Sequence, residues 1–193
     1  MTAQTGYVSG ESAALLWSRI TSVEDWPSPG VSFKDLSGVL EHGPAFSLVI
    51  DALAERVDNA ALDAVVGIEA RGFPYAAALA YRLGIGFVTL RKPGKLPRAV
   101  HSQEYSLEYG VATLEMHQDA LNQHERVLIV DDVLATGGTA AAAVELVLRT
   151  KTEIEAVAVI MEIPFLQGRG VLEAAGVDVI ALLDASAPHE IRR

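Results

Sequence analysis

Residues 126–139 read Arg-Val-Leu-Ile-Val-Asp-Asp-Val-Leu-Ala-Thr-Gly-Gly-Thr, a stretch that joins an apolar run, an acidic pair and a glycine-rich turn. The continuous apolar run at positions 127–130 predicts a strand that is buried on both faces of a parallel sheet. Good helix formers fill positions 140–148 and predict a helix after a short turn. Asp131 and Asp132 therefore come at the carboxyl end of the strand, where open α/β sheets bind their ligands.

The turn between this strand and helix has the composition of an anion-binding loop. Gly137 and Gly138 allow backbone N–H groups to close around an anion, and Thr136 and Thr139 add hydroxyl donors at the positive end of the helix. An acidic pair beside such a loop suits a ligand that carries hydroxyls, or a developing positive charge, next to its phosphate. A ribose 5-phosphate meets both demands. A structural turn with a solvated acidic pair is the alternative interpretation.

Length, composition and charge limit the class of protein. The chain has 193 residues, half of them hydrophobic, which predicts one domain with an ample core. It lacks cysteine, and no stretch has the character of a signal peptide or the roughly twenty apolar residues of a membrane span, so we expect a soluble cytoplasmic protein. A formal charge of −10 argues against nucleic acid or an anionic membrane as a partner.

A short basic segment supplies the positive charge that a polyanionic substrate requires. Residues 91–98 contain no acid. Their cations are Arg91, Lys92, Lys95 and Arg98. A solubilising surface loop is the alternative, but in an acidic protein with a phosphate loop the pattern indicates anion binding. The alternation of residues 104–116 predicts a hairpin, which could close as a lid over the reaction and exclude water.

The remaining pattern is one of alternating strands and helices. Strands are predicted at residues 63–68, 86–90, 156–163 and 177–182, and helices at residues 11–20, 44–57, 73–83 and around Leu172. Such alternation is typical of a parallel α/β sheet with helices on its faces. Arg71 and Gly72 lie in a second strand-to-helix turn, where a guanidinium and free N–H groups could hold another phosphate.

The segment 25–36 is too rich in proline and glycine for a helix and too apolar for a disordered linker, so we expect an ordered loop. Its prolines restrict the backbone around Phe33. The backbone N–H and C=O groups of Ser32 and Lys34 could therefore present a fixed hydrogen-bonding edge beside an aromatic ring, which suits a flat heterocycle. The frequent burial of aromatic residues favours instead an ordinary core position for Phe33.

Residues 126–139 resemble the signature of the type I phosphoribosyltransferases, in which an acidic pair holds the ribose hydroxyls and the Thr-Gly-Gly-Thr turn holds the 5-phosphate. Four further segments, in the same order, resemble the adenine phosphoribosyltransferases of that family. They are residues 29–35, 67–73, 91–97 and 105–110. The resemblance as a whole spans roughly residues 17–169. It implies transfer of the phosphoribosyl group from phosphoribosyl pyrophosphate to adenine, which yields AMP and pyrophosphate.

The resemblance also implies an architecture and an assembly. The expected fold is a single α/β domain of residues 1–193, with a Rossmann-like central parallel sheet flanked by helices. Residues 1–40 would form the N-terminal helix and a small hood, and residues 91–116 the flexible basic loop and flap. Mg²⁺ is the implied cofactor, held by pyrophosphate, ribose hydroxyls and water rather than by a cage of side chains. A homodimer is the implied assembly.

The residues for the sugar phosphate follow from matching the family's motifs to this chain position by position. Asp131 and Asp132 would hold the ribose hydroxyls. The residues that would cradle the 5-phosphate are Ala135, Thr136, Gly137, Gly138 and Thr139. Those that would meet the pyrophosphate are Arg71, Arg91, Lys92 and Lys95.

The same matching assigns the base site and the catalytic group. Phe33 and Ile163 would lie on the two faces of adenine, and the backbone of Ser32 and Lys34 would read its Watson–Crick edge. Glu108 would be the catalytic carboxylate that manages the purine proton, and Tyr109 would lie beside it on the flap.

Three other functions remain open. The base could be xanthine, hypoxanthine or guanine, because the hood is where members of the family differ, although backbone reading at the hood and the segment around Glu108 favour adenine. Lys34 stands where we expect Arg more often. A phosphoribosyl pyrophosphate sensor without catalysis would need a DNA-binding module, for which a single acidic domain has no room. A generic nucleotide-binding protein would carry G-x-G-x-x-G or G-x-x-x-x-G-K-[ST], and neither occurs.

Overall fold

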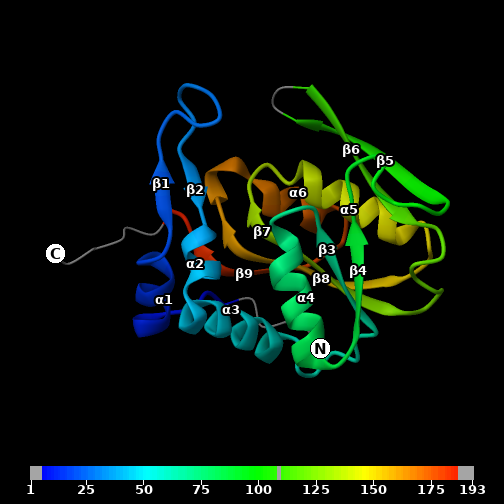
Figure 1. Cartoon of the computed structure of the whole chain (residues 1–193), viewed down its shortest axis with the longest axis horizontal. Helices are drawn as coiled ribbons and strands as arrows, with labels where there is room; N and C mark the ends of the chain where they lie inside the picture. The colour runs from blue at the N-terminus through cyan, green and yellow to red at the C-terminus, as the bar shows by residue number, and fades with distance from the viewer. Residues whose placement is uncertain (1–5, 108–109, 187–193) are drawn as a thin grey trace.

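A parallel sheet of five strands forms the centre of the computed structural model, which describes residues 6–107 and 110–186 (Figure 1). In spatial order the strands are β4 (Gly86–Leu90), β3 (Ala64–Ile68), β7 (Arg126–Leu134), β8 (Glu153–Glu162) and β9 (Val179–Asp184). Two antiparallel pairs accompany this sheet. They are β1 (Thr21–Val23) with β2 (Phe33–Asp35), which we call the hood, and β5 (Val100–Leu107) with β6 (Gly110–His117), which we call the hairpin.

Helices cover both faces of the central sheet (Figure 1). On one face lie α1 (Gly10–Trp17), α2 (Ser37–Glu41), α3 (Gly43–Arg56) and α4 (Gly72–Leu83). On the other face lie α5 (Gly138–Leu148) and α6 (Gly168–Ala174), the latter preceded by the 3₁₀ turn η1 (Pro164–Leu166). None of the helices within residues 6–107 and 110–186 is both long and apolar enough to cross a membrane.

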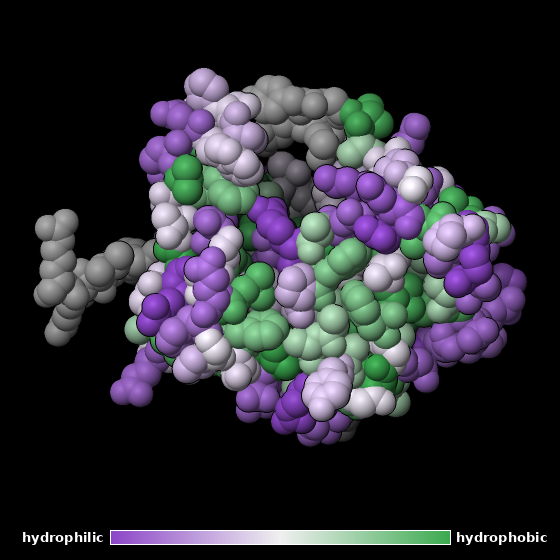
Figure 2. All heavy atoms as spheres, viewed as in Figure 1, coloured by the Kyte–Doolittle hydropathy of each residue, from purple (hydrophilic) through white to green (hydrophobic). Residues whose placement is uncertain are grey.

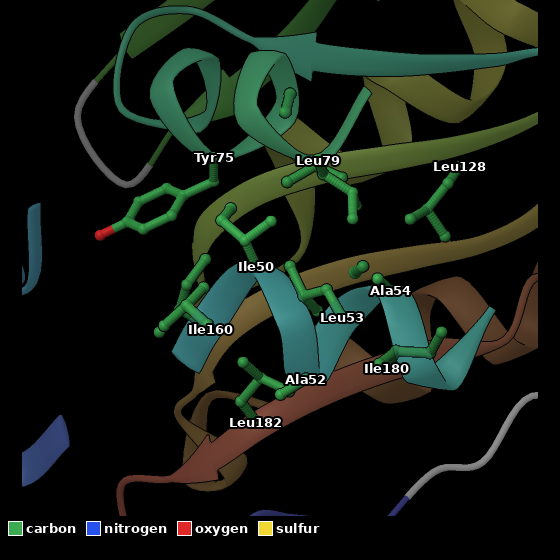
Figure 3. Packing of buried hydrophobic residues seen from close by; sticks show 14 of the residues in the cluster. Ile50, Ala52, Leu53, Ala54, Tyr75, Leu79, Leu128, Ile160, Ile180 and Leu182 are labelled. Atoms are coloured by element: carbon green, nitrogen blue, oxygen red, sulfur yellow. The ribbon is translucent and has the colours of Figure 1, made fainter. Parts of the chain in front are cut away.

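In the middle of the central sheet, successive residues of a strand pack into opposite layers of the core. In β7, Leu128 and Val130 belong to the layer of α3 and α4, whereas Val127 and Ile129 belong to the layer of α5. Figure 3 shows the first of these layers, where side chains of α3 and α4 meet those of the sheet. The apolar run 127–130 is thus buried on both faces, as its composition predicted.

The chain changes direction across the sheet between β3 and β7. From β3 it passes through α4 to β4 on one side, whereas from β7 it passes through α5, β8 and α6 to β9 on the other. In open α/β sheets the ligand crevice lies outside the carboxyl ends of the strands at such a point. The turn after β3 and the end of β7 are therefore the two places that position a site.

The observed strands confirm the parallel α/β prediction, but β7 is longer than expected. Its pairing with β8 continues through Asp131, Val133 and Leu134, so the acidic pair lies within the strand rather than beyond its end. The apolar run ends at Val130, but a backbone ladder needs no apolar side chain to continue. The hairpin also begins earlier than residue 104, at Val100. A turn is expected near residues 108–110; β6 begins at Gly110, and residues 108 and 109 lie outside the described part of the chain.

The segment 25–36 is not wholly a loop. β2 occupies its last part and pairs with β1 in the register Thr21↔Asp35 and Val23↔Phe33. Strands of three residues are too short to show a periodic pattern, which is why the sequence did not predict them. The first helix is likewise shorter than the predicted 11–20, because it ends at Trp17 before the chain enters β1.

Candidate active site

The acidic pair lies at the buried end of β7. Asp132 is only 2% exposed, and its Oδ1 accepts a hydrogen bond of 2.8 Å from the N–H of Val133. Asp131 Oδ1 accepts one of 2.9 Å from the N–H of Asp132. Burial raises the pKa of the Asp131 carboxyl well above its usual range, and the charge of Asp132 adds to the rise. Two carboxyls held in this way are typical of a functional site, and a solvated pair is the wrong description of Asp132.

Arg71 connects the acidic pair to the hood. Its Nε lies 3.0 Å from Oδ2 of Asp132, and its guanidinium carbon lies 5.0 Å from the ring centroid of Phe33. Burial raises the pKa of the Asp132 carboxyl, and the charge of Arg71 opposes that rise. Because β3 and β7 are adjacent parallel strands, residues far apart in the sequence meet at one edge of the sheet.

Phe33 lies at the inner side of the hood and not in the core. It is partly buried and belongs to neither hydrophobic layer. Its ring contacts Trp26 edge-on, with 4.3 Å between ring centroids, and Trp26 is itself 50% exposed. The side chains of Ser32 and Lys34 are engaged along the hood, the first with Glu24 at 2.8 Å and the second with Ser22 at 2.7 Å. An aromatic face is therefore held near Arg71 by a second aromatic ring.

The predicted phosphate loop, residues 135–139, joins β7 to α5. Gly137 has φ +86°, a left-handed conformation that favours glycine, and the helix begins at the next residue. The start of α6 packs directly on this loop, because a Cβ at Gly168 would lie only 2.2 Å from the backbone O of Ala135. The loop thus combines a positive helix end with a backbone that a second helix supports from behind.

Glu69 organises the basic loop, although the sequence did not single it out. Its Oε2 accepts hydrogen bonds of 2.8 Å from the N–H of Lys92 and 3.3 Å from Nε of Arg91. Burial works to raise the pKa of the Glu69 carboxyl, but the hydrogen bonds from Lys92 and Arg91 outweigh it and hold the pKa below its usual range. The sequence did give one indication of a role for Glu69, because it directly follows the predicted strand 63–68, at the edge of the sheet where ligands bind.

Glu115 of β6 fixes the other side of the same loop. Its backbone exchanges hydrogen bonds of 2.9 and 2.7 Å with Arg91, and its Oε2 accepts one of 3.0 Å from the N–H of Gly94. Within the described part of the chain, the side chains of Lys92 and Lys95 form no ion pair. Arg98 does form one, with Asp119 at 3.0 Å. Of the four cations of the basic segment, two are therefore held by carboxylates.

Of the remaining predicted residues, Ile163 lies in the described part of the chain, at the end of the strand next to β7. Ile163 follows β8 directly, is partly buried, and donates its N–H to the O of Leu134 at 2.9 Å. Glu108 and Tyr109 fall outside the described residues, between the ends of β5 and β6. Figure 2 shows a hollow between the hood and the hairpin, with hydrophilic side chains beside it. Among residues 6–107 and 110–186, no group of three or more His, Asp or Glu side chains could hold a metal ion.

Comparison with known sequences gives the family that the sequence motifs resemble. The family model of the phosphoribosyl transferase domain matches residues 37–170. The adenine phosphoribosyltransferase of Roseiflexus castenholzii is 55% identical over 150 residues, which are 78% of this chain and 87% of that enzyme. The adenine phosphoribosyltransferase of Streptomyces clavuligerus is 49% identical over 176 residues, 91% of this chain and 99% of that enzyme.

Solved structures agree with the sequence comparison. The adenine phosphoribosyltransferase of Giardia lamblia, complexed with 9-deazaadenine, matches with a TM-score of 0.87 at 35% identity, over 93% of this chain and 100% of that one. The enzyme of Saccharomyces cerevisiae, complexed with an imino-altritol bisphosphate and adenine, matches with a TM-score of 0.84 at 37% identity, over 89% of this chain and 98% of that one. The chain therefore belongs to the phosphoribosyltransferase family, among its adenine phosphoribosyltransferases.

Proposed function

We propose that this site transfers the phosphoribosyl group of 5-phosphoribosyl 1-pyrophosphate to adenine, which gives AMP and pyrophosphate. The observation that carries the proposal is the acidic pair on β7, in which Asp132 is buried and paired with Arg71, beside a glycine-rich helix start. The helix start and Arg71 can bind the anionic parts of a ligand, and the carboxylates can accept hydrogen bonds from its hydroxyls. The relatives named above, at 49% to 55% identity, support the choice of reaction.

The sugar phosphate would bind across the end of β7. The backbone N–H groups and hydroxyls of residues 135–139 would hold the 5-phosphate, while Asp131 and Asp132 accept hydrogen bonds from the ribose hydroxyls. Departure of pyrophosphate leaves a ribose with oxocarbenium character, and nearby carboxylates stabilise that positive charge. The hydrogen bonds that each Asp already accepts from the backbone support this role, since they fix the direction of the carboxyls.

The leaving pyrophosphate would meet the cations that the family resemblance implies for it. Arg71 lies in the turn after β3, and Arg91 and Lys92 are held by Glu69 beside that turn. Lys95 follows in the same basic loop. Positive charge aimed at the developing anion lowers the barrier to its departure. Because Arg71 contacts Asp132 in this structure, binding of the substrate would exchange that contact for one with pyrophosphate.

The base would bind between the hood and the end of β8. We propose that Phe33 and Ile163 lie on its two faces and that the backbone of Ser32 and Lys34 reads its Watson–Crick edge. The Phe33 ring, held by Trp26, supports this assignment. Adenine and 9-deazaadenine in the yeast and Giardia structures support the choice of base.

Proton management is the remaining chemical step. We propose that the Glu108 carboxylate accepts the proton that the purine loses as its nitrogen bonds to the ribose, and that Tyr109 closes over the site with it. The hairpin that carries both residues is tied to the basic loop through Glu115, which supports a common movement of the two segments. Closure would exclude water, which would otherwise compete with the base for the ribose.

We propose Mg²⁺ as the metal, bound mainly by pyrophosphate, ribose hydroxyls and water. The carboxylate oxygens of Asp131 and Asp132 are ligands of the kind that Mg²⁺ prefers. The site is therefore compatible with a Mg²⁺ ion that binds together with the substrate. When bound, Mg²⁺ would neutralise part of the charge on the leaving group.

We also propose that two copies of the chain associate through the surface formed by α4 and β4. β4 is an edge strand of the sheet, and Tyr81 and Phe87 are 90% and 37% exposed. Figure 2 shows hydrophobic residues gathered over these elements. Exposed apolar surface of this kind marks an interface between proteins. Sedimentation of Tyr81→Glu tests the proposal, since this variant should be monomeric where the wild type is dimeric.

The activity is tested by pyrophosphate release from 5-phosphoribosyl 1-pyrophosphate and Mg²⁺, with adenine, hypoxanthine, guanine, xanthine and uracil offered separately. We expect turnover with adenine alone. Turnover with another base would keep the sugar phosphate site and overturn the assignment of the hood. Tight binding of 5-phosphoribosyl 1-pyrophosphate without turnover of any base would identify a sensor instead.

A further inference from the structure

A buried carboxylate that the proposed reaction does not use lies at the end of β8. Glu162 is only 3% exposed. Its Oε2 accepts a hydrogen bond of 2.9 Å from Nε of Arg169 and lies 2.8 Å from Nη2 of the same side chain. Its Oε1 accepts a hydrogen bond from the hydroxyl of Tyr7. Both oxygens are thus paired, one by α6 and the other by the N-terminal segment.

The ion pair joins the two ends of the segment 163–168, which touches the proposed site at both ends. Ile163, its first residue, is tied to the end of β7 by the bond from its N–H to the O of Leu134. Gly168, its last residue, lies against the phosphate loop, since a Cβ there would be 2.2 Å from the O of Ala135. Glu162 and Arg169 stand immediately outside these two residues.

The Glu162–Arg169 ion pair is expected to add little to the stability of the fold. Desolvation of two charges offsets much of their attraction, and apolar residues of similar volume are often as stabilising. An ion pair does, however, restrict the orientation of its two side chains, because charge-assisted N–H···O bonds have a preferred geometry. The segment itself contains only the single turn of η1, and so short a 3₁₀ turn does little to fix its own ends. Arg169 is fixed further by the bond from its Nη1 to the O of Val179, at 3.0 Å.

We propose that Glu162 is a positioning residue for phosphoribosyl transfer. Through Arg169 it holds the segment 163–168 in the arrangement that sets Ile163 beside the base and presses Gly168 against the phosphate loop. Through Tyr7 it ties this arrangement to the N-terminal segment, which is itself held on β9 by the bond from Val8 N–H to the O of Leu182, at 2.9 Å. The proposal rests on the proposed roles of Ile163 and of residues 135–139.

The test is the kinetics of Glu162→Gln with adenine and 5-phosphoribosyl 1-pyrophosphate varied in turn. A glutamine keeps an acceptor for Tyr7 but turns an N–H₂ group toward the guanidinium. We expect KM for both substrates to rise about tenfold or more, because misplacement at a distance from the chemistry is costly, with a smaller change in kcat. Arg169→Lys, which keeps the charge but only one donor group, should show an intermediate rise. The matched control is Glu153→Gln, which breaks the 2.8 Å ion pair with Arg126 at the other end of β8 and should leave both KM values unchanged.

A second variant keeps the test decisive if Glu162→Gln does not fold. Glu162→Met with Arg169→Met replaces the ion pair by apolar side chains of similar length, and such exchanges usually preserve folding. Raised KM values in this folded variant would support positioning by Glu162. A lower melting temperature with both KM values unchanged would overturn it and leave a structural role. Failure of the wild type to use adenine would instead refute the proposed function, so the two failures are distinguishable.

Discussion

The Nε atom of Arg71 lies 3.0 Å from Oδ2 of Asp132, so the turn after β3 is joined to the buried end of β7. Arg71 is 56% exposed at its side chain, whereas Asp132 is 3% exposed. Arg71, which we propose binds pyrophosphate, is thus paired in this structure with Asp132, which we propose binds the ribose. The ion pair stabilises the buried Asp132 carboxylate in the absence of substrate.

Arg71→Ala should leave Asp132 without its cation. We expect a loss of about 1 kcal/mol in the free energy of unfolding, a modest value because Arg71 is largely exposed. KM for 5-phosphoribosyl 1-pyrophosphate should rise about tenfold or more, since a charge-assisted contact to pyrophosphate is lost. Steady-state kinetics and urea unfolding measure the two effects. Arg126→Ala, which removes an exposed ion pair at the opposite end of β7, is the control, and an equal response of both variants would contradict the assignment.

Asp131→Asn should stabilise the protein without substrate by about 1 kcal/mol near neutral pH. In the folded state the pKa of Asp131 is raised well above its usual 3.8. Between pH 3.8 and this raised pKa, the folded state therefore binds more protons than the unfolded state. The stability that this carboxyl contributes is therefore present at acid pH and lost as the pH rises through the folded pKa. The difference between variant and wild type should shrink from about pH 7 to about pH 4, as measured by urea unfolding. If the stability difference between Asp131→Asn and the wild type instead grows toward acid pH, the pKa of Asp131 is lowered in the folded state and the prediction is wrong.

Asp131→Ala with Asp132→Ala should abolish binding of 5-phosphoribosyl 1-pyrophosphate, because the ribose hydroxyls lose both acceptors. Isothermal titration calorimetry in the presence of Mg²⁺ measures the affinity directly. Asp51→Ala with Asp58→Ala makes the same change in net charge, at exposed side chains away from the site, and should bind as the wild type does. Unchanged affinity in the β7 variant would remove the central premise of the site.

Glu108→Ala should lower kcat by about 10² to 10⁴, the usual contribution of a positioned proton-transfer group. KM for 5-phosphoribosyl 1-pyrophosphate should change much less, since the phosphate and ribose contacts remain. Glu104→Ala removes an exposed carboxylate from the same hairpin and should turn over at the wild-type rate. The assigned role of Glu108 is wrong if its variant keeps a rate near that of the wild type.

Gly168→Ala should disturb the phosphate loop without touching any charged group. The added methyl would lie 2.2 Å from the backbone O of Ala135, so either α6 or the loop must move. We expect a loss of about 1 to 3 kcal/mol in stability and a higher KM for 5-phosphoribosyl 1-pyrophosphate. At Gly170, in the same helix, a Cβ would meet no atom within 4 Å. Gly170→Ala should therefore leave KM unchanged, and parallel behaviour of the two variants would refute the packing argument.

Local patterns predicted most of the helices and strands. The apolar run at 127–130, the glycine-rich turn after it and the helix that follows lie where the sequence places them. The same holds for the strand 86–90. Such features depend on neighbouring residues alone: hydrophobic periodicity, helix propensity and turn chemistry act over a few positions. The short strands β1 and β2 escaped prediction because three residues carry no period.

The local sequence patterns set the class of fold, a parallel α/β sheet, and they supply an acidic pair, a glycine-rich loop and a basic segment. Which of these groups are in contact depends on how the strands and helices pack together. The order β4-β3-β7-β8-β9 brings Arg71 to Asp132, and the return of β6 closes Glu115 on the basic loop. Likewise, Arg98 proved to be paired with Asp119, although no acid lies near it in the segment 91–98. These contacts join residues far apart in the chain, and they follow from which strands are adjacent, which is set by the packing of both layers of the core together.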